Sequence, residues 1–191
     1  MSSLLETRRF TVSEYLRLVE VGVLRPDEHV ELIDGLIVSM SPKGPVHSAL
    51  VSRIVARLVE LFPRERFCVR PQCTLALGDD YAPEPDIAVV AGRCEEHERE
   101  LPRSALLVIE VAETSARLDR GRKPDLYARA GVLEYWIVDL GEGVVEVRRE
   151  PSDAGYKLIR ILQPGDSLLP LPLEGAAAQL RAAELLPVGS K

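Results

Sequence analysis

The chain has 191 residues, a formal net charge of −6, a sequence pI of about 5.2 and 46% hydrophobic residues. This size and composition suit a soluble globular protein with a sizeable core, and we expect one domain over residues 1–191. The acidic balance excludes a protein that coats nucleic acid without specificity, because affinity for the phosphate backbone comes mainly from Lys and Arg. A nucleic-acid site in this chain must therefore be local or depend on a metal.

The sequence indicates neither secretion nor membrane insertion. No apolar run approaches the roughly 18 residues of a membrane span, and residues 1–6 lack the basic and apolar regions of a secretory signal. The cysteines Cys68, Cys73 and Cys94 fit neither a metal-binding pair nor a disulfide framework. We therefore expect a cytoplasmic protein with no membrane partner, in which Cys68 and Cys73 are buried thiols.

The N-terminal third is predicted to form a helix, a hairpin and a second helix. The predicted elements are a helix over 11–19, hairpin strands over 30–33 and 36–40, and an amphipathic helix over 47–61. The dipeptide Asp34-Gly35 favours a two-residue hairpin turn, because both of its residues tolerate positive φ. Pro63 ends the second helix.

The remaining sequence alternates between strand-like runs and turn residues. The predicted elements are strands over 66–70, 72–77, 86–91 and 106–112, a helix over 119–131, a strand over 134–140, a far-edge hairpin of 144–148 and 156–161, and a closing helix over 176–186. The core order is therefore helix, three strands, helix, strand. This order predicts a protein of helices and strands in one α/β domain.

Three residues in this framework point to chemistry. Asp86 opens one apolar strand and Glu110 lies inside another, where a carboxylate is costly to bury unless it is paired or bound to a metal. Lys123 starts a polar, helix-like segment. The alternatives are that Asp86 caps a turn, that Glu110 pairs with an arginine or reaches solvent at a strand end, and that Lys123 is a solvated helix residue.

Two acids and a lysine suit hydrolysis of a phosphodiester with a divalent metal. Magnesium prefers hard oxygen ligands and keeps several waters, so Asp86 and Glu110, with the Val111 carbonyl as a third ligand, would suffice. The metal would neutralise charge on the phosphoryl oxygens and acidify a water, which Lys123 would orient. His47, at the head of an amphipathic helix, could contact a phosphate. No motif of a competing enzyme class is present.

The chain also resembles a known family. Pro-Asp at 85–86, Ile-Glu-Val at 109–111 and Lys123, in this order of elements, resemble the PD-(D/E)XK nuclease superfamily. Glu-Leu-Ile-Asp-Gly at 31–35 and Ala-Gly-Val-x-Glu-Tyr-Trp at 130–136 look like its bacterial Uma-two type "putative restriction endonuclease" family.

The resemblance implies a restriction-endonuclease-like fold, an α/β (α+β) mixed sheet flanked by helices, with its core over residues 46–140. It implies that Asp86 and Glu110 ligate Mg²⁺ or Mn²⁺, and that the motif's lysine has moved from position 112, which holds Ala112, to Lys123. Glu31 becomes a further acidic candidate at the rim. Pro124 is comfortable only in the first turn of a helix and leaves the direction of Lys123 open.

The function expected from these observations is a magnesium-dependent endonuclease acting on DNA. The alternative is a catalytically degenerate nucleic-acid-binding or protein-interaction module on the same fold, and RNA or a small phosphodiester stays open as substrate. A homodimer is expected, since a two-fold dimer often cuts both strands of a duplex; the far hairpin or the closing helix would supply its interface. Tyr127, Tyr135 and Trp136 are expected to serve packing. Target sequence and biological role stay open.

Overall fold

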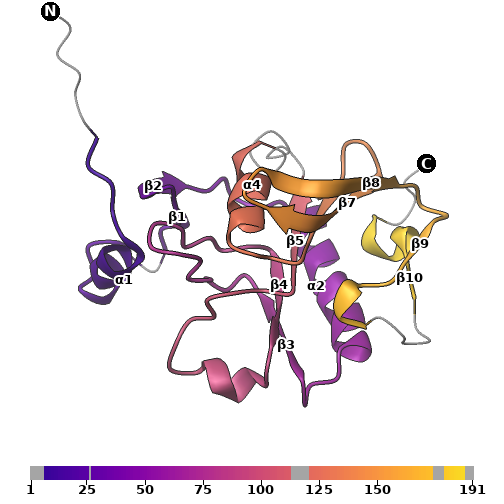
Figure 1. Ribbon diagram of the computed structural model, residues 1–191, viewed down its shortest axis with the longest axis horizontal. Coiled ribbons are helices and arrows are strands. Elements are labelled where there is room, and N and C mark those ends of the chain that lie inside the picture. The colour runs from indigo at the N-terminus through magenta and orange to yellow at the C-terminus, as the bar shows by residue number, and fades with distance from the viewer. Residues whose placement is uncertain (1–6, 26, 113–120, 174–178, 188–191) are drawn as a thin grey trace, which may run out of the picture.

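A six-stranded mixed sheet forms the centre of the computed structural model, which describes residues 7–25, 27–112, 121–173 and 179–187 (Figure 1). The strands, in spatial order, are β3 (Phe67–Pro71), β4 (Ile87–Ala91), β5 (Leu107–Ala112), β6 (Glu134–Asp139), β7 (Val144–Ser152) and β8 (Gly155–Leu162). Strands β5 and β6 pair in parallel, and the other neighbours pair antiparallel. The predicted far-edge hairpin is confirmed as β7 and β8.

Helices α2 (Pro45–Leu61) and α4 (Arg122–Arg129) cover opposite faces of this sheet (Figure 1). The two-residue period of a strand produces this arrangement, because successive side chains point to opposite faces. In β4, Ile87 and Val89 pack in the core under α2, whereas Ala88 and Val90 pack in the core under α4. The predicted core order of helix, three strands, helix and strand is confirmed as α2, β3, β4, β5, α4 and β6.

The N-terminal helix and hairpin also form as predicted. Helix α1 (Val12–Glu20) begins with a capping box between Thr11 and Glu14 and packs against the hairpin of β1 (Val30–Ile33) and β2 (Leu36–Ser39). Both turn residues have positive φ, 50° at Asp34 and 72° at Gly35. In the part of the chain that is described, no helix combines the length and apolar character needed to cross a membrane.

Two predicted elements are wrong. Residues 72–77 form no strand, because Gln72 adopts a φ of 49° and turns the chain out of β3. Leu75 and Leu77 still alternate and are buried, but their backbone N–H groups bond within a loop, to Pro83 and Tyr81, and this explains the misleading pattern.

The predicted closing helix over 176–186 is the second error. Residues 176–178 lie outside the described part of the chain, and the rest forms β10 (Leu180–Arg181) and a 3-10 turn, η3 (Ala182–Leu185). Strand β10 pairs with β9 (Ser167–Leu168), and this ladder replaces helical hydrogen bonds. Two further 3-10 turns are η1 (Cys94–His97) and η2 (Leu171–Leu173).

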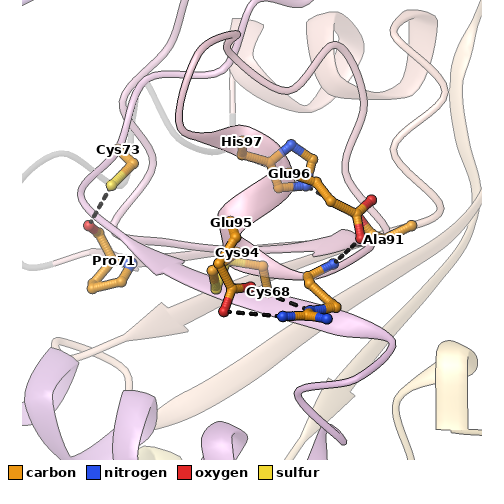
Figure 2. Close-up of a disulfide and its surroundings, with 9 residues drawn as sticks. Cys68, Pro71, Cys73, Ala91, Cys94, Glu95, Glu96 and His97 are labelled. Carbon is orange, nitrogen blue, oxygen red and sulfur yellow. Dashed lines mark hydrogen bonds and ion pairs between the residues drawn. A yellow bond between two sulfur atoms is a disulfide. The ribbon is translucent and has the colours of Figure 1, made fainter.

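A disulfide joins β3 to η1, so the prediction that Cys68 is a thiol is wrong (Figure 2). Cys68 and Cys94 are 26 positions apart, and their Cα atoms are separated by 4.9 Å. The antiparallel pairing of β3 and β4 brings them together, since Cys68 lies opposite Val90 and η1 follows β4. Cys73 is a free thiol, and it is partly exposed rather than buried.

Candidate active site

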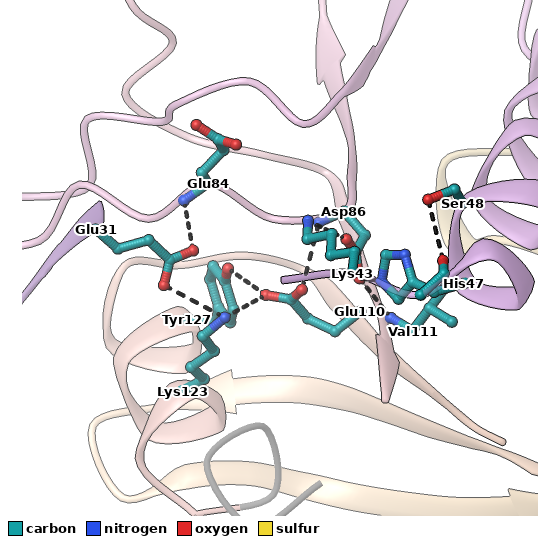
Figure 3. Close-up of polar contacts among 11 residues, drawn as sticks. Glu31, Lys43, His47, Ser48, Glu84, Asp86, Glu110, Val111, Lys123 and Tyr127 are labelled. Carbon is teal, nitrogen blue, oxygen red and sulfur yellow. Dashed lines mark hydrogen bonds and ion pairs between the residues drawn. The ribbon is translucent and has the colours of Figure 1, made fainter. Parts of the chain in front are cut away.

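The two predicted acids meet where β4 begins beside β5. Ile87 pairs with Ile109, so the antiparallel register continues with Asp86 opposite Glu110. The Asp86 backbone N–H donates to Glu110 Oε2 at 3.3 Å, and the Val111 N–H donates to Asp86 Oδ2 at 2.8 Å (Figure 3). Both carboxylates are buried, with 3% of Asp86 and 5% of Glu110 exposed. The strand pairing therefore sets their relative position.

Lys123 reaches Glu110 from α4. The Lys123 Nζ donates to Glu110 Oε1 at 2.9 Å, and the Tyr127 hydroxyl donates to the same oxygen at 3.1 Å. Lys123 and Tyr127 are one turn apart, so their side chains leave the same face of the helix. Pro124 is the third residue of α4, where a backbone N–H would have no partner within the helix, so it does not disturb this arrangement.

Glu31 lies on the other side of the Lys123 ammonium group. Its Oε2 is 3.4 Å from Lys123 Nζ, and its Oε1 accepts the backbone N–H of Glu84 at 2.8 Å (Figure 3). Glu31 was expected at the rim of the site, but it is completely buried on β1, because β1 pairs with the chain at Ala82 and the backbone of Glu84 contacts the carboxylate. Lys123 is 1% exposed, so its interpretation as a solvated helix residue is wrong.

Asp86 has two further partners, Lys43 from the segment before α2 and His47 from the first turn of α2. Lys43 Nζ donates to Asp86 Oδ1 at 2.6 Å, and His47 Nε2 lies 2.9 Å from Asp86 Oδ2. The imidazole of His47, a candidate phosphate contact from the sequence, is thus turned towards Asp86 and buried. We call Glu31, Lys43, His47, Asp86, Glu110, Lys123 and Tyr127 the candidate active site.

Burial and charge set the protonation of several of these groups. Burial alone would raise the pKa of Asp86, but the hydrogen bonds and charges of His47 and Lys43 outweigh it and hold this pKa below its ordinary value. Burial raises the pKa of Tyr127 well above its ordinary value, so its hydroxyl stays a donor to Glu110 at neutral pH. Burial likewise raises the pKa of the half-buried Glu84.

A cavity of about 340 Å³ leads to the site, within the range of small-ligand pockets. Its lining includes Lys43, Glu84 and Glu31, together with His29 and Gln72. The side chain of Lys43 is 28% exposed, lines the cavity and contacts Asp86 Oδ1. Lys43 is therefore available to a phosphate group that enters this cavity.

All six residues that the sequence singled out are in one connected group. Asp86, Glu110, Lys123, Glu31, His47 and Val111 are linked by the hydrogen bonds and ion pairs described above. The sequence interpretation missed Lys43 and Glu84, and it assigned Tyr127 to packing. Tyr127 carried a signal, since it follows Lys123 by four positions; Tyr135 and Trp136 are buried in the core as predicted.

Comparison with known proteins agrees with this architecture. The model of the Uma2 family, described as "Putative restriction endonuclease", matches residues 12–183. A solved structure from Anabaena variabilis ATCC 29413, described as a "putative nuclease belonging to DUF820", is similar with a TM-score of 0.74 and 20% identity over 92% of this chain and 97% of that chain. No curated relative matches the chain.

At 20% identity, the solved structure bears on the fold, and it confirms the predicted restriction-endonuclease-like mixed α/β architecture. The family match bears on the lineage, since it spans all of the helices and strands from α1 to β10. The family match supports a nuclease in the broad sense. The chain therefore belongs to the Uma2 family of restriction-endonuclease-like proteins.

Proposed function

We propose that this chain is a divalent-metal-dependent endonuclease that hydrolyses phosphodiester bonds in DNA. One observation carries the proposal: the buried Lys123 ammonium lies 2.9 Å from Glu110, whose second oxygen accepts the backbone N–H of Asp86. Two acids and a lysine held in contact by three separate elements are costly to bury, and such clusters of buried charge are concentrated at functional sites.

The donor set fits magnesium or manganese. Among the described residues, no group of three or more His, Cys, Asp or Glu side chains is arranged as a metal cage. Mg²⁺ does not need one, because it is commonly held by one or two carboxylates, waters and the substrate phosphate. Asp86, Glu110 and the Val111 carbonyl would hold the ion. When bound, it would neutralise charge on the phosphoryl oxygens.

The chain's own residues would supply the remaining steps. Lys123 stays in place between Glu110 and Glu31. Its ammonium group would donate a hydrogen bond to the attacking water or to a phosphoryl oxygen. Tyr127 would keep Glu110 in its orientation. His47 would do the same for Asp86 and hold it as a carboxylate.

The net charge of −6 limits how DNA would bind. An acidic surface gains little from non-specific attraction to phosphates, so affinity would depend on contacts near the cavity and on the metal. Lys43 and His29 are the basic groups that line the cavity. We therefore expect weak binding of DNA without a divalent ion and clear binding in its presence.

Cleavage of supercoiled, linear and single-stranded DNA with Mg²⁺ or Mn²⁺ tests the proposal. The wild type is compared with Asp86→Asn and Glu110→Gln, and Glu146→Gln removes a buried acid of β7 outside the site as a matched control. We expect metal-dependent cleavage by the wild type and by the control, and none by the two site variants. Cleavage that persists in both site variants contradicts the proposal.

A second candidate is a catalytically degenerate nucleic-acid-binding or protein-interaction module. All four carboxylate oxygens of Asp86 and Glu110 accept hydrogen bonds from the chain itself, and this favours a structural use of the two acids. Such a module would bind DNA without cutting it under any metal, and Asp86→Asn would not change the binding. Cleavage of RNA or of a small phosphodiester, but not of DNA, would instead change the substrate class that we propose.

We also propose a cytoplasmic homodimer. Edge strand β8 exposes Leu158, Ile159 and Ile161, which suit an interface between two copies. Light scattering after size exclusion is expected to give a dimer for the wild type and a monomer for Ile159→Lys. A monomeric wild type contradicts the dimer without affecting the proposed chemistry.

A further inference from the structure

We propose that the ammonium group of Lys43 occupies the cation position at Asp86 in the metal-free protein and leaves it when a divalent ion binds. This inference rests on the proposed metal-dependent function. Lys43 lies in the irregular segment 40–44 between β2 and α2, and its Nζ is 2.6 Å from Asp86 Oδ1. It is thus a second lysine at the site, and no nuclease motif assigns it a role.

The charges of the site explain why a cation must be present before the metal arrives. Three carboxylates gather along the polar contacts of Figure 3, those of Glu31, Asp86 and Glu110, and two ammonium groups contact them. An isolated buried carboxylate is expensive, and the side chain of Asp86 is 4% exposed. Lys43 supplies the charge that lets Asp86 stay ionised in the interior.

The two oxygens of Asp86 are not equivalent. Oδ2 is held by the Val111 N–H at 2.8 Å and lies 2.9 Å from His47 Nε2, so the fold itself fixes it. Oδ1 contacts Lys43, whose side chain lines the cavity. A metal ion that takes Oδ1 as a ligand would stand beside the ammonium, and like charges at that separation repel each other strongly in a buried site. Oδ1 can therefore hold Lys43 or the metal, but not both.

The position of Lys43 allows its side chain to move away from Asp86, whereas the position of Lys123 holds its side chain in place. Lys43 comes from an irregular segment, its side chain is 28% exposed, and its four-carbon stem can turn into the adjacent cavity. Lys123 comes from a helix, is 1% exposed and lies between two buried carboxylates. Exchange at Lys43 would leave the contacts of Lys123 with Glu31 and with Glu110 Oε1 in place.

Direct binding of Mn²⁺ to metal-free protein, followed by the electron paramagnetic resonance signal of the free ion, tests the exchange without an activity assay. The variant Lys43→Met removes the competing charge, and Lys157→Met removes an exposed lysine of β8 as a matched control. We expect Lys43→Met to bind Mn²⁺ at least about tenfold more tightly than the wild type, since one competing charge is gone. Lys157→Met is expected to match the wild type, and Lys43→Arg to show no gain, because it keeps the charge.

Melting temperatures give a second readout. Without metal, Lys43→Met is expected to melt below the wild type, and Mn²⁺ is expected to raise its melting temperature by more than it raises that of the wild type. If Lys43→Met is too unstable to isolate without metal, Lys43→Gln takes its place in both measurements.

Two results overturn the inference, and they are distinguishable. In the first, Lys43→Met binds Mn²⁺ no more tightly than the wild type, while Asp86→Asn no longer binds Mn²⁺. This result would leave the proposed metal site intact and show Lys43 to be a permanent partner of Asp86. Absence of Mn²⁺ binding from every variant and from the wild type would overturn the metal dependence of the proposed function, and the exchange with it.

Discussion

Lys123 and Glu110 are 13 positions apart in the chain, yet Nζ of the lysine lies 2.9 Å from Oε1 of the glutamate in the interior of the fold. Strand β5 presents Glu110 on the face that α4 covers, and the first turn of α4 directs Lys123 onto it. Two buried charges are stable here because each neutralises the other, and Glu31 adds a second carboxylate to the same ammonium. Stability and proposed chemistry therefore depend on one contact.

Lys123→Met is expected to lower the free energy of unfolding by about 3 to 5 kcal/mol, because it leaves buried carboxylates without their cation. Urea unfolding measures the loss. The double variant Lys123→Met/Glu110→Gln should recover part of it, since one of the two uncompensated charges is removed as well. Wild-type stability of Lys123→Met would show that the ion pair contributes nothing to the fold.

Tyr127→Phe tests whether the hydroxyl orients Glu110. The loss of a hydrogen bond to a charged group is expected to cost about 1.5 to 3 kcal/mol of stability. Loss of a group that orients a metal ligand is expected to weaken Mn²⁺ binding by about tenfold to a hundredfold. Tyr156→Phe is the matched control, because its hydroxyl donates to the Val132 carbonyl instead. Equal Mn²⁺ affinity in both variants would make Tyr127 a packing residue, as the sequence suggested.

The lowered pKa of Asp86 makes the stability depend on acid pH. A carboxyl whose pKa is lower in the folded state stabilises the fold above its unfolded pKa of about 3.9, and this contribution is lost as pH falls through the folded pKa. The wild type should therefore lose stability below about pH 4 more steeply than Asp86→Asn does. Urea unfolding between neutral and acid pH measures both slopes, with Asp153→Asn as an exposed control. Parallel profiles for the wild type and Asp86→Asn would contradict this linkage.

Residues of the site could be predicted from the sequence where a charged side chain lies in an apolar segment, because burial of that charge has a free-energy cost. Glu110 stands out because a carboxylate in an apolar strand requires a partner. Lys123 could be named as a third residue of the site, but its contact with Glu110 could not, since Pro124 left its direction open and an arginine was the expected alternative partner of Glu110. Lys43 was missed because nothing local in residues 40–44 indicates a contact with Asp86, 43 positions away. Long-range contacts from irregular segments have no periodic pattern to reveal them.

The contrast between local patterns and long-range contacts also explains which predicted helices and strands were correct and which were wrong. Strands β4 and β5 were predictable because their alternating side chains face two cores. Residues 72–77 share that alternation, yet their backbone bonds within a loop, and side-chain pattern alone does not determine backbone pairing. The pairing of Cys68 with Cys94 was equally hidden, because it depends on the register of β3 and β4.

Reduction of the disulfide between Cys68 and Cys94 is expected to lower the free energy of unfolding by about 3.5 kcal/mol, because opening a loop of 26 positions returns entropy to the unfolded chain. Urea unfolding of oxidised and reduced protein measures this, with Cys73→Ser as the control that keeps the bond. DNA cleavage should not change, since Cys68 lies opposite Val90, at the far end of β4 from Asp86. Rapid alkylation of thiols in intact cells then decides where the bond forms, as disulfides are rare in a reducing cytoplasm. Equal unfolding midpoints for the oxidised and reduced forms would rule out a stabilising role for this disulfide.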